Sequence, residues 1–157
     1  MVERAAYVCR QVAADDEGDV GELVRLRMDW SRSQGLEPTP DFAERFGAWW
    51  ARQSGHRVAW LARPTDGGPA VGMANVTVFE RMPRPGTPDA RWAYVGNVWV
   101  DVEHRRRGVG AALMADVVQW CRDAGMLRVV LNPSEMSLPL YRGLGFRPAD
   151  DLMLLEL

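Results

Sequence analysis

Apolar residues recur at helical spacing in three stretches of the sequence. They lie every third or fourth residue along 17–32, along a stretch that opens with Thr39 and Pro40, and along a stretch that follows Gly110. This spacing places apolar side chains on one face of a helix, so it predicts three amphipathic helices. Asp15 or Asp16, in the acidic run before the first helix, is expected to cap it, and Thr39 is expected to cap the second. Their apolar faces are Val20, Leu23, Val24 and Met28 in the first, Phe42, Phe46, Trp49 and Trp50 in the second, and Leu113, Met114, Val117, Val118 and Cys121 in the third.

Runs of β-branched and aromatic residues between these helices are typical of strands. The turn-forming "TDGGP" joins two of the runs into a hairpin, and the proline-rich segment 81–91 is expected to be an exposed loop. A short helix is predicted over 137–144. The 127–132 run is almost wholly apolar, which favours a strand buried on both faces. The predicted strands are 7–12, 57–64, 70–80, 92–102, 127–132 and a closing strand within 147–157.

The order of these elements, β-α-α-β-β-β-α-β-α-β, predicts a single α/β (α+β) domain that covers residues 1–157. Nearly half of the residues are apolar and the net charge is -2, which is ordinary for a soluble globular chain and too acidic for a typical nucleic-acid-binding protein. The first twenty residues contain no apolar stretch of signal-peptide length, and no run reaches the roughly eighteen apolar residues that a membrane span needs. We therefore expect a cytoplasmic protein that binds neither nucleic acid nor membrane.

Neither the cysteines nor the histidines form a metal-binding pattern. Cys9 and Cys121 lack CxxC spacing and are expected to be reduced residues of the core. His56 and His104 lie apart from other possible ligands, and we interpret both as surface residues. No metal cofactor is predicted.

The stretch that begins at His104, "HRRRGVGAALMADV", combines three arginines, two glycines and the start of a helix. Backbone N–H groups in the first turn of a helix have no partners within the helix and attract phosphate. Gly108 and Gly110 let the backbone approach a bulky anion, and the arginines at 105–107 add attraction. The stretch therefore predicts a cradle for a pyrophosphate. A solvated basic turn that only caps a helix is the alternative.

Two other nucleotide-binding motifs do not fit this stretch. A Walker loop needs Lys and then Ser or Thr after its last glycine, but Ala111 and Ala112 follow Gly110. A Rossmann fingerprint needs a further glycine where this chain has Leu113, and it lies in the first βα turn rather than a late one.

The stretch "VWVDVEHRRRGVGAALM" resembles the acetyl-CoA signature of the GCN5-related N-acetyltransferase (GNAT) superfamily, Q/R-x-x-G-x-G/A at the start of a helix. Arg105, Gly108 and Gly110 fill the signature positions. A second stretch, "SEMSLPLYRGLGF", resembles the late helix, tyrosine and glycine-phenylalanine ending of that family, and the element order matches over nearly the whole chain. The resemblance implies the GNAT fold, a central, mixed and mostly antiparallel sheet with splayed strands 4 and 5, flanked by about four helices.

The resemblance implies that acetyl-CoA is the cosubstrate. Its pantetheine arm would lie between the fourth and fifth strands, and its diphosphate would lie on the backbone N–H groups of 105–111. Trp99 would contribute through its backbone, and its side chain would be a core or surface aromatic. Asn132 could end the fifth strand through a side-chain turn instead of binding the cosubstrate. The residues expected to bind acetyl-CoA are Val98, Trp99, Val100, Arg105, Arg106, Arg107, Gly108, Val109, Gly110, Ala111, Asn132, Ser137 and Tyr141.

The resemblance also implies direct attack of a primary amine on the acetyl thioester. Tyr141 aligns with the tyrosine that protonates the departing thiolate in this family, and a phenol with an ordinary pKa of about 10 stays protonated at neutral pH. A backbone N–H near Val100 is the expected oxyanion donor. The alternative for Tyr141 is a packed aromatic that only touches the cosubstrate.

The sequence departs from the family at two places. Many amine acetyltransferases of this type have acidic residues where this chain has Gly96 and Asn97, so the usual general base is absent. Glu80 is the preferred substitute, although a carboxylate at a strand end is more commonly just solvated, and Asn97 is expected to position a water. Ser134 and Ser137 stand where many relatives have Asn and Ala. Weaker candidates for the base are Asp101, Glu103 and His104.

The resemblance places the amine acceptor against the first two helices, the loop that joins them, and the proline-rich loop between the third and fourth strands. Trp30, Trp49 and Trp50 could line a pocket for an apolar amine there, or Trp49 and Trp50 could pack the second helix onto the sheet. The sequence thus predicts an acetyl-CoA-dependent N-acetyltransferase acting on an amine of a small molecule, peptide or protein. A non-catalytic acyl-CoA-binding module is the alternative, and the sequence leaves open a homodimer.

Overall fold

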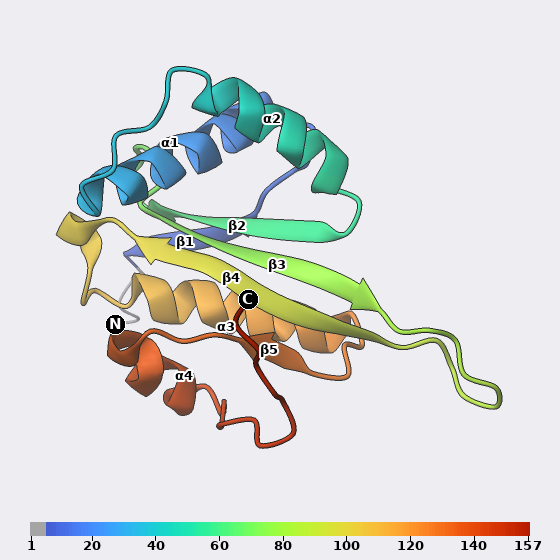
Figure 1. The fold of residues 1–157 in the computed structure, drawn as a ribbon. Coiled ribbons are helices and arrows are strands. Elements are labelled where there is room, and N and C mark those ends of the chain that lie inside the picture. The colour runs from blue at the N-terminus through green and yellow to red at the C-terminus, as the bar shows by residue number, and fades with distance from the viewer. Residues whose placement is uncertain (1–5) are drawn as a thin grey trace.

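The computed structural model describes residues 6–157, which contain one five-stranded sheet in the order β1-β2-β3-β4-β5. The strands are β1 (Tyr7–Gln11), β2 (Arg57–Pro64), β3 (Gly72–Glu80), β4 (Arg91–Val100) and β5 (Val129–Leu131). Neighbouring strands pair antiparallel, except that β4 and β5 pair in parallel. The predicted mixed and mostly antiparallel sheet is confirmed (Figure 1).

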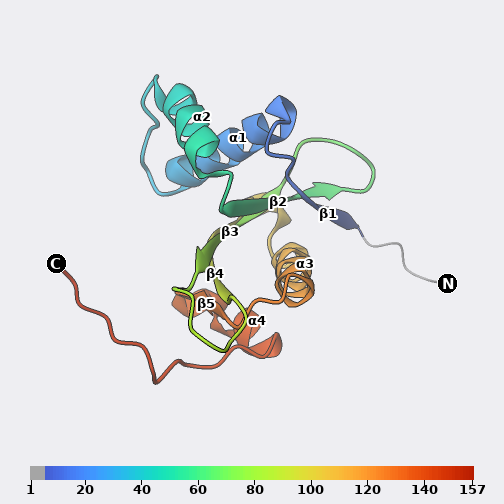
Figure 2. The same ribbon diagram turned by 90° about the vertical axis from the view of Figure 1, so that its right-hand side faces the viewer.

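Helices cover both faces of this sheet (Figures 1 and 2). α1 (Glu17–Ser33) and α2 (Phe42–Gln53) lie on one face, α3 (Val109–Asp123) lies on the other, and α4 (Leu138–Gly143) lies near β5. Short 3₁₀ turns at Val102–His104 and Glu135–Ser137 precede α3 and α4. Among the described helices, none is both long and apolar enough to cross a membrane.

Each face of the sheet has its own apolar core, because successive side chains of a strand point to opposite faces. The core under α3 includes Cys121, and Cys9 packs at its edge, both as free thiols, as predicted. The core under α1 and α2 includes the buried Trp99, so its side chain is a core aromatic, one of the two roles predicted for it. The sheet therefore separates two layers of packed side chains.

α1 and α2 differ in what precedes their first turn. Asp16 caps α1 by accepting a hydrogen bond from the backbone N–H of Asp19 at 3.1 Å, which confirms the prediction for this acidic run. The cap predicted at Thr39 is wrong, because residues 39–41 form a turn in which the N–H of Phe42 bonds the carbonyl of Thr39 at 3.0 Å. α2 therefore begins at Phe42, with Asp41 at the N-cap position.

The buried face of α1 is rotated from the predicted one. Leu26 is fully buried, whereas Val24 and Met28, both predicted to face the core, are only half-buried. Asp19 lies on the same side of the helix as Leu26 and pairs with Arg63 of β2 at 3.0 Å. This ion pair turns that side of α1 toward the sheet, which periodicity alone does not reveal.

β4 contains a bulge near its middle. Trp99 pairs with Met73 of β3 and Gly96 pairs with Asn75, so two residues of β4 lie opposite one residue of β3. Asn97, at the bulge, has φ 54°, in the left-handed region that asparagine tolerates better than most residues. The extra residue shifts the alternation of β4 by one position beyond the bulge.

β5 and the end of the chain differ from the prediction. β5 pairs with β4 only at three positions, from Ala93 to Val95, and its residues are half-buried rather than buried on both faces. The closing strand predicted within 147–157 is wrong, since this segment contains no strand and Leu154 and Leu155 are 86% and 80% exposed. A strand needs a partner, and the short β5 offers little edge to pair with.

Candidate active site

Beyond its three paired positions, the edge of β4 that faces β5 has no strand partner within residues 6–157, because β5 diverges (Figure 1). The backbone N–H of Asp101 bonds the carbonyl of Val71 at 2.8 Å, on the side of β3. Backbone groups alternate between the two edges of a strand, so Val98 and Val100 direct theirs to the other edge, on the side of β5. β4 thus offers an unpaired main-chain edge to an extended ligand.

This edge leads to the N-terminus of α3. Gly108 is the N-cap with φ 81°, and Arg106 has φ 59°. The first backbone hydrogen bond of the helix runs from the N–H of Ala112 to the carbonyl of Gly108 at 2.9 Å. The N–H groups of 109–111 therefore have no backbone acceptor in the described part of the chain, and they stand at the positive end of the helix dipole. Such a helix tip binds phosphate.

The three arginines of the turn differ in their contacts. The Nε–H of Arg105 donates to the carbonyl of Val100 at 3.0 Å, so this side chain ties the turn to the end of β4. Arg106 and Arg107 are exposed and form no ion pair with another described residue. Their guanidinium groups can therefore reach a bound anion, whereas Arg105 positions the turn.

The two glycines of the turn differ in whether the backbone requires them. A Cβ at Gly108 would meet no atom within 4 Å, but φ 81° is unfavourable for any residue with a side chain. A Cβ at Gly110 would lie 3.6 Å from Cδ2 of Leu140 and 4.0 Å from Cγ2 of Val100, which are ordinary contacts. The backbone itself therefore requires glycine only at position 108.

Tyr141 lies on α4, is 7% exposed and packs in the core under α3. Its ring is edge-on to Phe146, with 5.7 Å between the ring centroids. Burial raises the pKa of the Tyr141 phenol above its ordinary value, so the group is protonated at neutral pH. This protonation fits a proton donor, and the packing fits the alternative of a purely structural aromatic.

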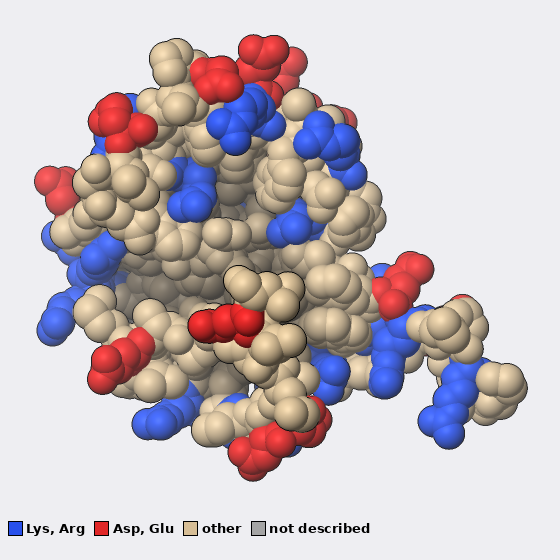
Figure 3. Space-filling view, in the orientation of Figure 1, with Lys and Arg blue, Asp and Glu red and all other residues tan. Residues whose placement is uncertain are grey.

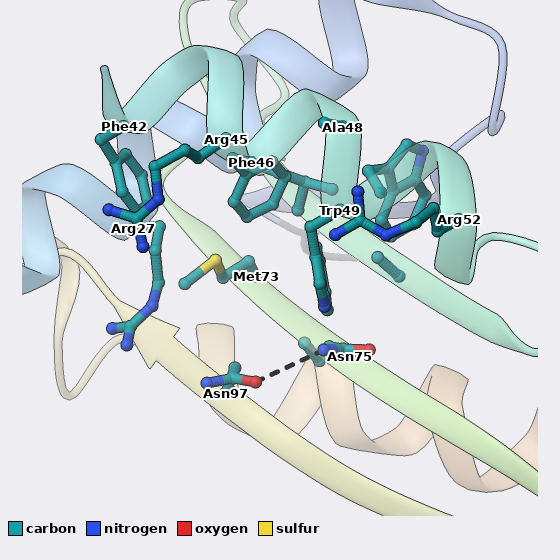
Figure 4. Close-up of a pocket in the computed structure, with 14 residues that line it drawn as sticks. Arg27, Phe42, Arg45, Phe46, Ala48, Trp49, Arg52, Met73, Asn75 and Asn97 are labelled. Carbon is teal, nitrogen blue, oxygen red and sulfur yellow. Dashed lines mark hydrogen bonds between the residues drawn. The ribbon is translucent and has the colours of Figure 1, made fainter. Parts of the chain in front are cut away.

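A pocket of about 480 Å³ lies between α1, α2 and the bulge of β4 (Figure 4). Asn75 and Asn97 lie opposite α2 in this pocket, and the Nδ2–H of Asn75 donates to Oδ1 of Asn97 at 3.3 Å. Three arginines, 27, 45 and 52, also line it. The apolar walls include Leu23, Phe42, Phe46, Trp49 and Met73.

The tryptophans of α1 and α2 have separate roles. Trp49 lines the pocket, as one interpretation of the sequence predicted. Trp50 is buried and its Nε1–H donates to the carbonyl of Ala14 at 3.1 Å, so it packs α2 onto the rest of the fold. Trp30 lies outside the pocket lining, with the guanidinium of Arg27 4.4 Å above its ring.

The structure does not bring Glu80 to Asn97. Glu80 is exposed and pairs with Arg91, five residues along β3 from Asn75, which is about 17 Å at the usual rise of a strand. Nor does it support His104 as a surface residue, since His104 is half-buried and its Nδ1 lies 3.0 Å from the hydroxyl of Tyr7. His56 is exposed, as predicted.

The remaining candidates make local contacts. Asp101 accepts a hydrogen bond from the N–H of Glu103 at 3.2 Å, at the start of the turn before α3. The hydroxyl of Ser137 donates to the carbonyl of Ser134 at 2.8 Å and so braces the turn before α4. Asn132 is exposed and follows β5 directly. Within residues 6–157 no His, Cys, Asp or Glu side chains gather into a group that could hold a metal ion.

Sequence reasoning missed Asn75 and the arginines of the pocket. Asn75 carries the one side-chain amide in the run "VGMANVTVF", whose other residues are apolar except Thr77, and this is a usable signal. The arginines come from two helices, and nothing in the sequence says how those helices face each other.

Comparison with known proteins supports one family. Residues 22–146 match the acetyltransferase (GNAT) family. The chain is 36% identical over 90 residues to glucosamine 6-phosphate N-acetyltransferase of Trypanosoma brucei brucei, a match that covers 57% of this chain and 59% of that protein. The chain thus spans about three fifths of this relative, and it spans 47% of N-acetyltransferase 8F1 of Rattus norvegicus.

Two solved structures share the fold. A GCN5-related N-acetyltransferase from Ralstonia eutropha is 27% identical with a TM-score of 0.69, covering 96% of this chain and 98% of that one. A predicted acetyltransferase from Clostridium acetobutylicum, solved with acetyl-CoA, has a TM-score of 0.73 at 18% identity and covers 96% of each chain. With the family match over most of its length, this chain belongs to the GNAT acetyltransferase family.

Proposed function

We propose that this protein transfers the acetyl group of acetyl-CoA to a primary amine held in the pocket between α2 and the bulge of β4. One observation carries the proposal: the unpaired edge at Val98 and Val100 leads directly to the bare N–H groups at 109–111. An extended ligand with amide groups along its arm and a diphosphate at its end fits both features. Coenzyme A has this chemistry, and a single domain over 1–157 carries the activity.

Acetyl-CoA, when bound, supplies a thioester carbonyl that the amine attacks. The backbone groups of Val98 and the N–H of Val100 hydrogen-bond the amides of the arm as a neighbouring strand would, while the carbonyl of Val100 keeps its hydrogen bond from Arg105. An N–H of this edge faces the thioester oxygen, and because it is fixed it needs no reorganisation as negative charge develops. The N–H groups at 109–111 hold the diphosphate, assisted by Arg106 and Arg107.

Tyr141 serves as the general acid. Its proton passes from the phenol oxygen to the sulfur of the departing thiolate as the carbon–sulfur bond breaks. The raised pKa of Tyr141 keeps the proton on the phenol until that step, and a buried site excludes the water that would compete.

The amine loses its proton without a carboxylate in contact. No Asp or Glu is among the residues that line the pocket in the described chain. Asn75 and Asn97 instead hold a water through which the proton of the ammonium leaves to bulk solvent, and Glu80, at the far end of β3, takes no part in this step. The rate with a given acceptor therefore rises with pH up to the pKa of the amine itself.

Thermal unfolding with acetyl-CoA, followed by a thiol-release assay with an amine panel, tests the proposal. Acetyl-CoA at about 100 times its Kd should stabilise the fold by about 2.7 kcal/mol, which raises Tm by roughly 5–10 °C. The chain contains no lysine, so acetylation of its own lysines cannot release CoA. An unchanged Tm would refute acetyl-CoA binding, whereas a raised Tm without CoA release from any amine would favour the non-catalytic binding module.

A further inference from the structure

The pocket is far more positive than the helices that form it. Residues 17–53, which contain α1 and α2, carry seven carboxylates and five arginines. The pocket lining nevertheless contains three of the arginines and none of those carboxylates. Figure 3 shows basic side chains along the helical side of the hollow on this face, acidic ones farther out beyond them, and an acidic side chain at the opposite edge of the hollow. The helices therefore present their positive charge to the pocket and their negative charge to solvent.

The pocket arginines have little negative charge near them. Within residues 6–157, Arg27 and Arg52 form no ion pair, and Arg45 only reaches Asp41 at 4.0 Å across an exposed contact. An exposed pair at that distance contributes little. Arg27 is half-buried, and burial lowers the pKa of its guanidinium, which still stays charged at neutral pH.

The nearby carboxylates of α1 form ion pairs with arginines that lie outside the pocket. Asp29 lies 3.0 Å from Arg25 and 3.3 Å from Arg32, and Glu22 also pairs with Arg25. These pairs lie on α1 outside the pocket lining. They leave the charge of the pocket uncompensated.

A fourth arginine, Arg57, supports the wall of the pocket that Trp49 forms. The guanidinium of Arg57 stacks on Trp49 at 4.9 Å and donates to Oδ1 of Asn75 at 3.4 Å. Its Nε–H is buried without an acceptor among the described residues. A positive, partly desolvated recess of this kind attracts an anionic ligand more strongly than an exposed charge would.

Building on the function proposed above, we infer that the acceptor is a small amine that also carries a carboxylate or phosphate group, together with an apolar or ring-shaped body. The anionic group binds the pocket arginines, which suit carboxylate and phosphate equally. The body lies against Phe46, Trp49 and Met73, and the amine reaches Asn97 at the bulge, beside the open edge of β4 (Figure 4). Polycationic amines are disfavoured, because like charges repel in the recess.

Matched pairs of acceptors test this inference. Phenylalanine is compared with phenylalanine amide, and glucosamine 6-phosphate with glucosamine. Each anionic acceptor thus has a partner that lacks only the anionic group, here called the neutral partner. An aminoglycoside serves as the polycation. We expect the anionic member of at least one pair to have a kcat/KM about tenfold or more above its neutral partner, as for a charge-assisted hydrogen bond. The pair that responds identifies the group as carboxylate or phosphate.

Single variants identify which pocket arginine binds the anionic group. Arg27→Gln, Arg45→Gln and Arg52→Gln should each raise the KM of the anionic acceptor, by about tenfold for the arginine that contacts it, and leave the KM of the neutral partner within about twofold. The Tm shift with acetyl-CoA should not change in any of them. Arg122→Gln, an exposed arginine of α3 on the opposite face of the sheet, is the matched control and should behave as wild type.

Binding is also measured without turnover. In the presence of CoA, the anionic member of the responding pair should raise Tm more than the neutral one. The inference is overturned if neutral or polycationic amines bind and react at least as well as anionic ones while acetyl-CoA still stabilises the protein. Loss of acetyl-CoA stabilisation itself would instead refute the proposed function, so the two failures are distinct.

Discussion

Tyr141 is a buried phenol whose pKa is raised, so it holds its proton until a strong base appears beside it. In Tyr141→Phe we expect kcat to fall by about 100-fold, because the thiolate would then leave unprotonated. The Tm shift with acetyl-CoA should stay close to that of wild type, since the ring and its contact with Phe146 remain. Stopped-flow or steady-state CoA release measures kcat.

Tyr94→Phe is the matched control for this change. Tyr94 lies on β4 with its side chain 36% exposed and outside the pocket lining, so kcat should not change. If Tyr141→Phe turned over at the wild-type rate, Tyr141 would be a packed aromatic and the thiolate would take its proton from water.

The two thiols give the protein a predictable response to alkaline pH. Burial raises the pKa of Cys121 to about 11, and burial together with Asp116 raises that of Cys9 to about 11, against 9.0 for a free thiol. The unfolded chain therefore loses these protons first, so the free energy of unfolding should fall as pH rises from about 9 to about 11. The absence of lysine removes the usual competing titration.

Urea denaturation at a series of pH values measures this fall. In the double variant Cys9→Ala, Cys121→Ala the slope between pH 9 and 11 should become shallower, and the remaining slope should come from tyrosines such as Tyr141. An unchanged slope would mean that the thiols are solvated in the folded protein.

The turn before α3 is the element on which binding depends. Gly108→Ala must hold alanine at φ 81°, which costs about 1–2 kcal/mol or moves the N–H groups of 109–111. We expect Gly108→Ala to lose most of the Tm shift with acetyl-CoA. Gly110→Ala should keep the fold, because its Cβ would only make ordinary contacts. Differential scanning fluorimetry measures both.

Gly125→Ala is the control for the stability that is lost when an alanine is held at a positive φ away from the acetyl-CoA site. Gly125 has φ 68° at the other end of α3, so this variant should lose similar stability while keeping the full Tm shift with acetyl-CoA. Equal loss of the shift in both glycine variants would show that general destabilisation, not the geometry of the helix tip, is responsible.

At the scale of elements, local sequence signals predicted most of what the structure contains. The apolar faces of α2 and α3, the hairpin at 65–69 and the turn at 105–110 are set by neighbouring residues, so periodicity and glycine spacing reveal them. The bulge at Asn97 had a local signal too, the "GN" in a β-branched run, but only the register with β3 shows its effect on the open edge. The rotation of α1 depends on the distant Arg63 and had no local signal.

At the scale of the whole molecule, the sequence predicted the coenzyme side better than the acceptor side. The backbone edge and helix tip come from one continuous segment, 96–112, whereas the pocket combines α1, α2, β3 and β4. Arg27, Arg45 and Arg52 form one positively charged site only because α1 and α2 face the same pocket. The wrong closing strand has the same cause, because a strand depends on an edge elsewhere in the fold.

A crystal structure of the acetyl-CoA complex tests the central claim most directly. It should show the pantetheine amides hydrogen-bonded to the backbone of Val98 or Val100, the diphosphate on the N–H groups of 109–111, and β5 still apart from β4 beyond Val95. Acetyl-CoA bound away from that edge, or β5 paired with β4 as far as Val100, would contradict it.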